Sequence, residues 1–310
     1  MRKFLLLFII GSVICSSCAR KRTTRNHIKY VTREELKISK QSEHNENGGN
    51  TYPSLEKNTS SYELSRLINQ DKELIIPRLG YTISYNSKTK LANWVAWHLT
   101  KEHTNGPYSR KGVPYYDESG IALGIGVVTS ATNRGVYFID TMVDGEKQDF
   151  CDWTAAKDLN LNHGHLCPAA DNRWSKEAMN QSFLLTNICP QDIDLNAGDW
   201  EKLEKKCRLW ANFYGDVYIV AGPVFFRKEY KTMGNHHVGI PDAFFKVILC
   251  MKDTPKAIGF LFPNKGTSQP LKNYLATVDS LEIVSGIDFF YNLPDDIENV
   301  VEKSSDIHNW

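Results

Sequence analysis

The 310-residue chain has almost no net charge, no long apolar run and no C-x-x-C pair. Its 37 Lys and Arg nearly balance 36 Asp and Glu, so the formal net charge is +1. This balance argues against a protein that coats nucleic acid, because such binding needs basic side chains to neutralise many phosphates. The apolar run Phe4–Val13 has about half the roughly 20 residues that a membrane-spanning helix needs. Without a C-x-x-C pair, a structural zinc site is not expected.

The composition is that of a soluble globular protein. Hydrophobic residues make up 41% of the chain and charged residues 24%, which is close to the average and excludes collagen, coiled coils, polytopic membrane proteins and wholly disordered chains. A length of 310 residues allows one large domain or two small ones, and either buries a sizeable core.

The first 18 residues have the pattern of an export signal. A basic start precedes Phe4–Val13, and small residues precede Cys18, which resembles the lipobox of bacterial lipoproteins. The resemblance implies that Cys18 is acylated and anchors the protein to a membrane, on the periplasmic or outer-membrane face of the bacterial envelope. Ordinary secretory cleavage nearby is the alternative, and it would release a secreted protein.

Residues 19–76 are expected to form a tether that is first basic and then polar. Residues 1–40 hold 10 Lys and Arg against 2 Glu, which leaves 27 basic and 34 acidic side chains in the other 270 residues. Residues 41–60 are rich in Asn, Ser, Glu and Gly and have too little apolar surface to fold. We therefore expect one folded domain at 77–293, mildly acidic overall, followed by a tail at 294–310.

Five cysteines follow Cys18, and an odd number leaves at least one thiol outside any disulfide within the chain. Within the folded domain, apolar runs alternate with helical stretches. A helix is indicated by an apolar stripe at i, i+3, i+7 and i+10, formed by Trp200, Leu203, Cys207 and Trp210. Residues 94–99 are expected in the core, and a short helical turn is expected at 281–286. Strands are predicted at 120–128, 135–143, 183–188 (stopped by Pro190), 217–221 (ended by Gly222-Pro223), 244–251 and 257–262. Mixed strands and helices with many hairpins favour an α+β fold around an antiparallel sheet.

The segment Asn162-His163-Gly164-His165 is the first that suggests chemistry. On a strand, both imidazoles would share a face, which suits a transition metal. Such a pair is more often polar surface, and no third ligand follows at a recognisable spacing. The pair alone is therefore weak evidence.

Later segments strengthen it, because their order and spacing match a known motif series. The series continues with Thr186–Gln191 and Leu195–Glu204, and then with Ala221–Pro223 and Ile240–Val247. Over about 77–293 the chain resembles the DNA/RNA non-specific endonuclease family, His-Me finger nucleases whose ββα-metal motif reads D-R-G-H, S-N-x-x-P-Q and L-N-x-x-x-W-x-x-L-E. The resemblance implies a single catalytic domain of that fold and Mg²⁺- or Mn²⁺-dependent hydrolysis of DNA and RNA, with contacts to the phosphate backbone.

The resemblance also implies roles for particular residues. His165 would be the general base, since an imidazole accepts a proton near neutral pH. Asn196 would bind the metal directly, and Glu204 would hold its water. Arg208 would pair with Glu204 or with the phosphate, and Asn187 would orient the site. Taken singly, Asn196 could be a helix cap, and the two charged residues an ordinary i, i+4 pair.

The chain departs from the family where D-R-G-H becomes N-H-G-H. Asn162 replaces the acid, and His163 replaces an arginine whose charge is permanent. By their positions in the motif, both residues are expected to contact the substrate. A partly charged His163 would make cleavage more pH-sensitive, and Arg110 is the family-like cation that could compensate. Two alternatives stay open: a catalytically weakened relative that binds nucleic acid without efficient cleavage, and a transition-metal site at the histidine pair.

Overall fold

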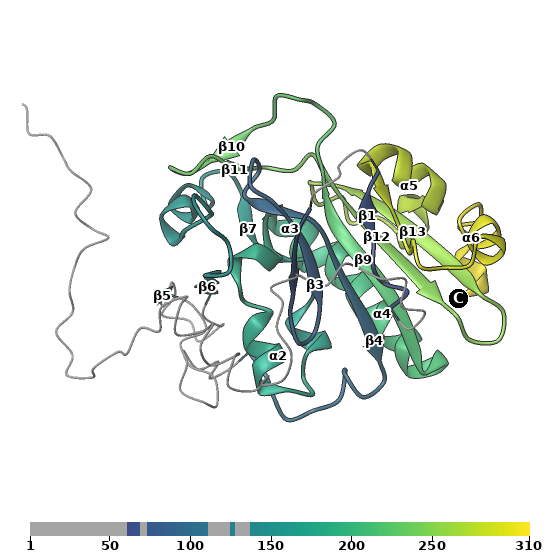
Figure 1. The fold of residues 1–310 in the computed structure, drawn as a ribbon. Helices are drawn as coiled ribbons and strands as arrows, with labels where there is room; N and C mark the ends of the chain where they lie inside the picture. Colours follow the sequence, from purple (N-terminus) through teal and green to yellow (C-terminus); the bar gives the residue numbers. More distant parts are fainter. Residues whose placement is uncertain (1–60, 69–72, 111–124, 128–136) are drawn as a thin grey trace, which may run out of the picture.

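The computed structural model describes residues 61–68, 73–110, 125–127 and 137–310 (Figure 1). The expected signal peptide, Cys18 and most of the expected tether lie outside these residues. Within the described part, no helix has both the length and the hydropathy to cross a membrane.

The centre of the fold is a seven-stranded sheet in which every neighbouring pair is antiparallel. The strand order across the sheet is β14-β13-β12-β9-β4-β3-β2. In chain order the strands are β2 (Leu74–Pro77), β3 (Thr82–Asn86), β4 (Leu91–Thr100), β9 (Asp216–Val224), β12 (Ala243–Cys250), β13 (Lys256–Pro263) and β14 (Leu275–Ala276). The α+β class around an antiparallel sheet is confirmed.

Shorter elements surround this sheet. The two-stranded pairs are β1 (Arg66–Leu67) with β15 (Ile287–Asp288), β5 (Ile125–Val127) with β6 (Tyr137–Ile139), β7 (Leu161–His165) with β8 (Ile188–Asp192), and β10 (Thr232–Met233) with β11 (Val238–Gly239). The helices are α2 (Lys176–Gln181), α3 (Ile193–Leu195), α4 (Glu201–Tyr214), α5 (Val278–Ser285) and α6 (Asp295–Val301). Single turns are η2 (Phe150–Ala155), η3 (Ala169–Asp171), η4 (Leu185–Asn187), the π-helical η5 (Asn196–Trp200), η6 (Leu271–Tyr274) and η7 (Ile307–Asn309).

The sheet is buried on both faces, and β12 shows how the sequence achieves this. Successive side chains of a strand point to opposite faces. Phe244 and Ile248 join the core on the side of α4, whereas Phe245 and Val247 join a second core on the side of α5 and α6. We call these sides the α4 face and the α5 face; the helices cover them in Figure 1. A strand buried on both sides explains the apolar run at 244–251, which Lys246 interrupts.

Several expected elements are present with small differences. The predicted stripe is the buried side of α4, β12 pairs with β13, and β5 pairs with β6 within the expected hairpin, parts of which lie outside the described residues. The strand expected at 183–188 begins later, as β8, and includes Pro190. Because β8 has a partner on one side only, Pro190 can occupy it without breaking a second ladder. Likewise β9 continues through Gly222-Pro223 to Val224.

The folded part extends beyond both expected limits. Before residue 77, β1 pairs with β15 and β2 forms an edge of the main sheet. After residue 293, α6 packs against β13. Both segments are short and pack their apolar side chains against the larger cores, and such long-range packing leaves no local pattern that would have separated them from a tether and a tail.

Candidate active site

The strands β7 and β8 pair antiparallel, with η3, α2 and η4 between them along the chain. From β8 the chain continues through α3 and η5 into α4, which gives the order of a ββα unit. In the register, His165 lies opposite Ile188. Between the two histidines, a Cβ on Gly164 would lie only 2.4 Å from Oε1 of Gln191. Glycine at this position therefore permits the close approach of the two strands.

A hydrogen bond fixes the start of the helical segment against the end of β7. Nε1 of Trp200 donates to the carbonyl oxygen of His165 at 3.1 Å. The Trp200 ring is fully buried against Phe244 and Phe262 of the main sheet. The half-buried Asn196 begins η5, four residues before this anchor.

His165 is buried and surrounded by aromatic rings. Its ring meets Phe183 edge-on at 5.2 Å and lies 5.8 Å from Tyr137 between centroids. Burial, with the nearby charges of Arg110 and His163, holds the pKa of His165 well below its ordinary value. Nε2 has no hydrogen-bond partner among the described residues. The imidazole is therefore neutral, the form that can accept a proton.

His163 lies between two aromatic rings, 3.7 Å from Trp153 and 4.2 Å from Tyr137 between centroids. Burial lowers its pKa to about 3. The expectation of a partly charged His163 near neutral pH is therefore wrong: the stack removes the ring from the water that would stabilise a cation. The neighbouring Asn162 is exposed, and its Oδ1 accepts the backbone N–H of His163 at 2.8 Å.

Glu204 lies on α4 and accepts no hydrogen bond from any described residue. Burial raises the pKa of its carboxyl group to about 7, and the cations of Lys246 and Arg208 oppose this rise. A carboxylate that is withdrawn from water and lacks a protein partner is a suitable acceptor for a divalent cation or its bound water. The residues at this position thus fit the metal that the sequence motif implies.

Arg208 forms an ion pair with Asp171 rather than with Glu204. Its Nη1 lies 2.8 Å from Oδ1 of Asp171, and Oδ2 accepts Nε1–H of Trp97 at 3.1 Å. Asp171 is buried, so its charge requires a cation close by. The expected pairing with Glu204 is therefore replaced by one that spans η3 and α4.

Asn187 is fully buried and holds the chain that leaves β7. Its Nδ2 donates to the carbonyls of Cys167 (2.9 Å) and Ser182 (2.8 Å), and its Oδ1 accepts the N–H of Cys167 at 2.9 Å. These bonds connect the end of β7 to the end of α2. The geometry agrees with the orienting role that the motif implies.

Arg110 is exposed, and its guanidinium lies over the ring of Phe183, 5.6 Å from the centroid. Its charge lowers the pKa of both His165 and Glu204. The structure therefore brings Arg110 into the electrostatic environment of both residues, although it is distant from them in the sequence.

Sequence reasoning missed Lys246, which projects from β12 on the α4 face and is fully buried. Its ammonium lies 4.1 Å from the ring centroid of Trp200 and 5.4 Å from that of Trp97. It has no hydrogen-bond partner among the described residues. A lysine within an apolar strand was the available indication, because lysine is almost never fully buried without a reason.

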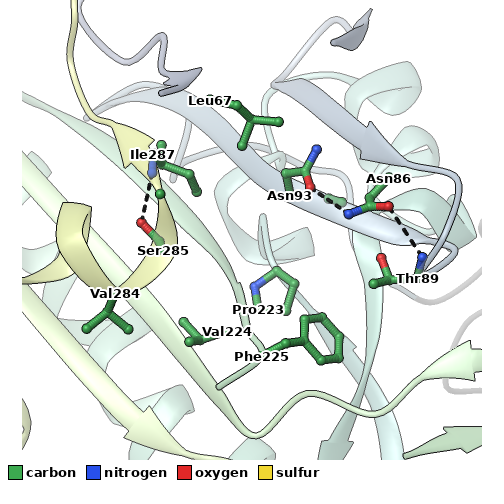
Figure 2. Close-up of a pocket in the computed structure, with 12 residues that line it drawn as sticks. Leu67, Asn86, Thr89, Asn93, Pro223, Val224, Phe225, Val284, Ser285 and Ile287 are labelled. Carbon is green, nitrogen blue, oxygen red and sulfur yellow. Dashed lines mark hydrogen bonds between the residues drawn. The ribbon is translucent and has the colours of Figure 1, made fainter. Parts of the chain in front are cut away.

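Another cavity, of about 300 Å³, lies between β3, β4, β9 and the end of α5 (Figure 2). None of the sequence-predicted site residues lines it, and no charged side chain does. Its two amides bond each other, Nδ2 of Asn86 donating to Oδ1 of Asn93 at 2.9 Å. A cavity lined by uncharged side chains lacks the cations that bind phosphate, so the ββα unit remains the candidate active site.

Comparisons with known proteins show what the chain is similar to. The family model described as "DNA/RNA non-specific endonuclease" matches residues 62–296. "Nuclease EXOG, mitochondrial" of Xenopus laevis is 31% identical over 233 residues, which covers 70% of this chain and 58% of that protein. "Endonuclease G, mitochondrial" of Bos taurus is 28% identical over 229 residues, covering 70% and 69%. The chain therefore spans less than two thirds of the frog nuclease.

A solved structure shares the fold. The crystal structure titled as the EndoG/EndoGI complex superposes with a TM-score of 0.58 at 20% identity, covering 72% of this chain and 88% of the other.

Proposed function

Because the chain belongs to the DNA/RNA non-specific endonuclease family, we propose that it is a hydrolase that cleaves phosphodiester bonds in DNA and RNA. The observation that carries the proposal is the β7–β8–α4 unit, in which the Trp200 indole bonds the carbonyl of His165 at 3.1 Å. This bond joins the strand that ends in the proposed base to the segment that carries the proposed metal ligands, Asn196 and Glu204.

His165 is the general base. Its Nε2 takes a proton from the attacking water, and the low pKa keeps this nitrogen unprotonated at neutral pH. The aromatic wall of Phe183 and Tyr137 fixes the ring plane, so that the nitrogen is presented in one direction. Asn187 maintains the backbone immediately after the base by its bonds to Cys167.

Asn196 and Glu204 would hold a divalent cation, Mg²⁺ or Mn²⁺. The amide oxygen of Asn196 would be a direct ligand, and Glu204 would accept a hydrogen bond from bound water, which would satisfy a carboxylate that has no other partner among the described residues. The cation, when bound, supplies positive charge to the scissile phosphate and the leaving oxygen. With few protein ligands, room remains for phosphate oxygens.

The substrate is held through its phosphates. Cleavage without sequence preference cannot depend on contacts to base edges. Arg110 is the exposed cation near the base, so it contacts the backbone of the substrate. Arg208 stays paired with Asp171 and positions α4 beneath the site.

A second candidate function is a weakened relative that binds nucleic acid without efficient cleavage. The observation that favours it is the neutral, stacked His163 at the position of the family arginine. Loss of a permanent cation removes transition-state stabilisation, even though the base and the metal ligands are retained.

Incubation of the full-length protein with supercoiled plasmid and with RNA, in Mg²⁺ or in chelator, distinguishes the two functions. We expect Mg²⁺-dependent cleavage of both polymers, and a loss of about 10²- to 10⁴-fold in His165→Ala, the usual contribution of a general base. His308→Ala, at an exposed histidine of η7, is the matched control and should cleave normally. Gel-shift binding without Mg²⁺-dependent nicking would support the weakened relative and reject the nuclease.

We also propose that the protein is exported and anchored in the bacterial envelope through acylated Cys18, which the lipobox-like sequence supports. In bacterial cells fed labelled palmitate, the full-length protein should take up label and partition into detergent, and Cys18→Ala should do neither. Equal labelling of both proteins would reject the anchor, and release into the medium would favour ordinary secretion.

A further inference from the structure

On the α5 face, three carboxylates converge where α5 begins and α6 ends. Asp279 and Glu282 belong to α5, and Glu302 follows directly after α6. One carboxylate oxygen of each lies within 4.8 Å of the other two. In Figure 1 these helices lie side by side at the end of the molecule away from α2 and β7. The cluster is therefore separate from the candidate active site.

Glu302 is the residue that requires an explanation. Its side chain is only 7% exposed, and its Oε1 has no hydrogen-bond partner among the described residues. Withdrawing a carboxylate from water without a partner is costly, and a buried charge is normally paired or bound to a metal. The carboxyl group that carries this unpartnered oxygen belongs to the cluster, since one of its oxygens lies within 4.8 Å of an oxygen of Asp279 and of Glu282.

No basic side chain of the described residues forms an ion pair with any of the three carboxylates. Asp288, whose charge also acts on Glu302, is paired with Arg66, Nε to Oδ2 at 2.7 Å. The other charged groups that act on Glu302 are the carboxylates of Glu298 and Asp288. Burial and these like charges raise the pKa of Glu302 to about 8, and burial raises that of Glu282 to about 7. The three acidic groups therefore lie close together without a basic partner among the described residues, an arrangement that resists ionisation unless a cation binds.

We propose that Asp279, Glu282 and Glu302 form a second divalent-cation site, selective for Ca²⁺. Ca²⁺ accepts six to eight oxygen ligands at about 2.3–2.6 Å, so oxygens on opposite sides of the ion are about 5 Å apart. Three oxygens within 4.8 Å of one another can all reach such an ion, and the flexible coordination of Ca²⁺ tolerates their placement better than the near-ideal octahedron that Mg²⁺ requires. Waters complete the coordination on the half-exposed side of Asp279 and Glu282.

The site joins the last helix to the body of the protein. Oε1 of Glu282 already accepts the N–H of Phe289 at 2.9 Å, which holds this carboxylate in place. A cation between Glu282 and Glu302 would connect α5 with the end of α6, both of which pack on β13. The role is structural, and it does not depend on cleavage.

Calcium binding to full-length protein that carries Asn196→Ala tests the site without interference from the active-site metal. After treatment with chelator, calorimetric titration with CaCl2 should find one equivalent of bound Ca²⁺. We expect a dissociation constant of about 10 μM, within the usual range of Ca²⁺ sites. At 1 mM CaCl2, about 100-fold above this constant, ligand linkage predicts a Tm several degrees higher than without Ca²⁺. Adding Glu302→Gln should weaken binding at least tenfold and abolish the Tm increase. Asp296→Asn, which removes the same charge from an exposed position of α6, should change neither.

Two results would overturn the proposal. One is the absence of Ca²⁺ binding at millimolar concentration in Asn196→Ala. If Glu302→Gln then melts at a higher temperature without metal, the carboxyl groups share protons instead of binding a cation. The other is binding that survives Glu302→Gln unchanged. If Glu302→Gln does not fold, Asp279→Asn at its half-exposed position decides in the same way. Because binding and Tm are the readouts, a failure of the nuclease proposal would not alter the result.

Discussion

His163 occupies the position of the family arginine, yet it cannot serve as a cation. The ring lies between Trp153 and Tyr137, and its pKa of about 3 is far below the ordinary 6.5. Folding thus favours the neutral form. Between pH 3 and pH 6.5 the unfolded chain binds the proton that the folded chain rejects, so acidification through this window destabilises the fold.

Replacing His163 by Phe should preserve the stack and remove the titration. Across pH 6–8 we expect the ratio of wild-type to variant cleavage rates to stay constant within about twofold, because His163 is neutral throughout this range. Below pH 6.5 the wild type should lose stability relative to His163→Phe by at most about 1.4 kcal/mol per pH unit. Urea unfolding from pH 4 to pH 8 measures this slope. A wild-type rate that rises selectively toward pH 6 would contradict the neutral assignment.

The charge of Lys246 acts on acidic groups at and near the proposed metal ligands. Its buried ammonium lowers the pKa of both Glu204 and Asp171. In Lys246→Met the pKa of Glu204 should rise above 7, so that most of the carboxyl group is protonated at neutral pH. We expect the Mg²⁺ concentration for half-maximal cleavage to rise about tenfold or more, with partial recovery at pH 8.5, where Glu204 ionises again.

Lys256 supplies the matched control for this prediction. It also lies over aromatic rings, 4.2 Å from the centroid of Tyr214 and 5.2 Å from that of Trp310, but at the C-terminal end of α4, where Tyr214 lies ten residues after Glu204. Lys256→Met should leave the Mg²⁺ requirement unchanged. A similar shift in both variants would mean that Lys246 acts only through general stability.

At this scale, motif spacing was sufficient to nominate His165, Asn196 and Glu204, because their separations along the chain are characteristic. It could not find the partner of Arg208. Asp171 lies 37 residues away from it, and only the packing of η3 against α4 brings the two together. Contacts of this kind are properties of the tertiary structure and leave no local pattern.

Among the elements, the close approach of the antiparallel strands β7 and β8 depends on Gly164. A Cβ there would meet Oε1 of Gln191 at 2.4 Å and Cβ of the same residue at 2.5 Å. Gly164→Ala should therefore separate the strands and destabilise the protein by about 1–3 kcal/mol, the usual cost of overpacking, with reduced cleavage. Gln191→Ala shortens the opposing side chain, and the double variant should be less destabilised than the sum of the two single variants. Additive effects in urea unfolding would show that the two residues do not compete for space.

The elements differ in how well the pattern of the sequence predicted them. The stripe of α4 was clear because its period of 3.6 persists over three turns. The secondary structure of residues 183–192 was harder to predict, since apolar residues before a proline suggest a strand that ends at the proline. Here the chain first makes η4, which places Asn187 against Cys167, and only then enters β8. Tertiary hydrogen bonds, rather than local preference, set that boundary.

On the scale of the whole molecule, the sheet separates two roles. The α4 face carries the ββα unit and Lys246, whereas the α5 face carries β1, α5, α6 and the acidic cluster. The residues after position 40 have an acidic excess, 34 acidic against 27 basic side chains. If the proposed function holds, attraction of a polyanion is local to Arg110 and the proposed metal site, and an enzyme that releases its product does not need a uniformly basic surface.

The structure also predicts where the chain can be shortened. Tyr62 packs edge-on against Tyr218 at 5.4 Å between centroids, and Arg66 bonds Asp288, so residues 61–68 cover part of the α5 face. A protein comprising residues 61–310 should keep the Tm of the full chain, since residues 41–60 have the composition of a tether. One comprising residues 77–310 loses β1 and β2, exposes apolar surface and should melt at least about 5 °C lower. Thermal melts followed by circular dichroism measure the difference. Equal Tm values for the two shortened proteins would show that the segment before residue 77 contributes nothing to the fold.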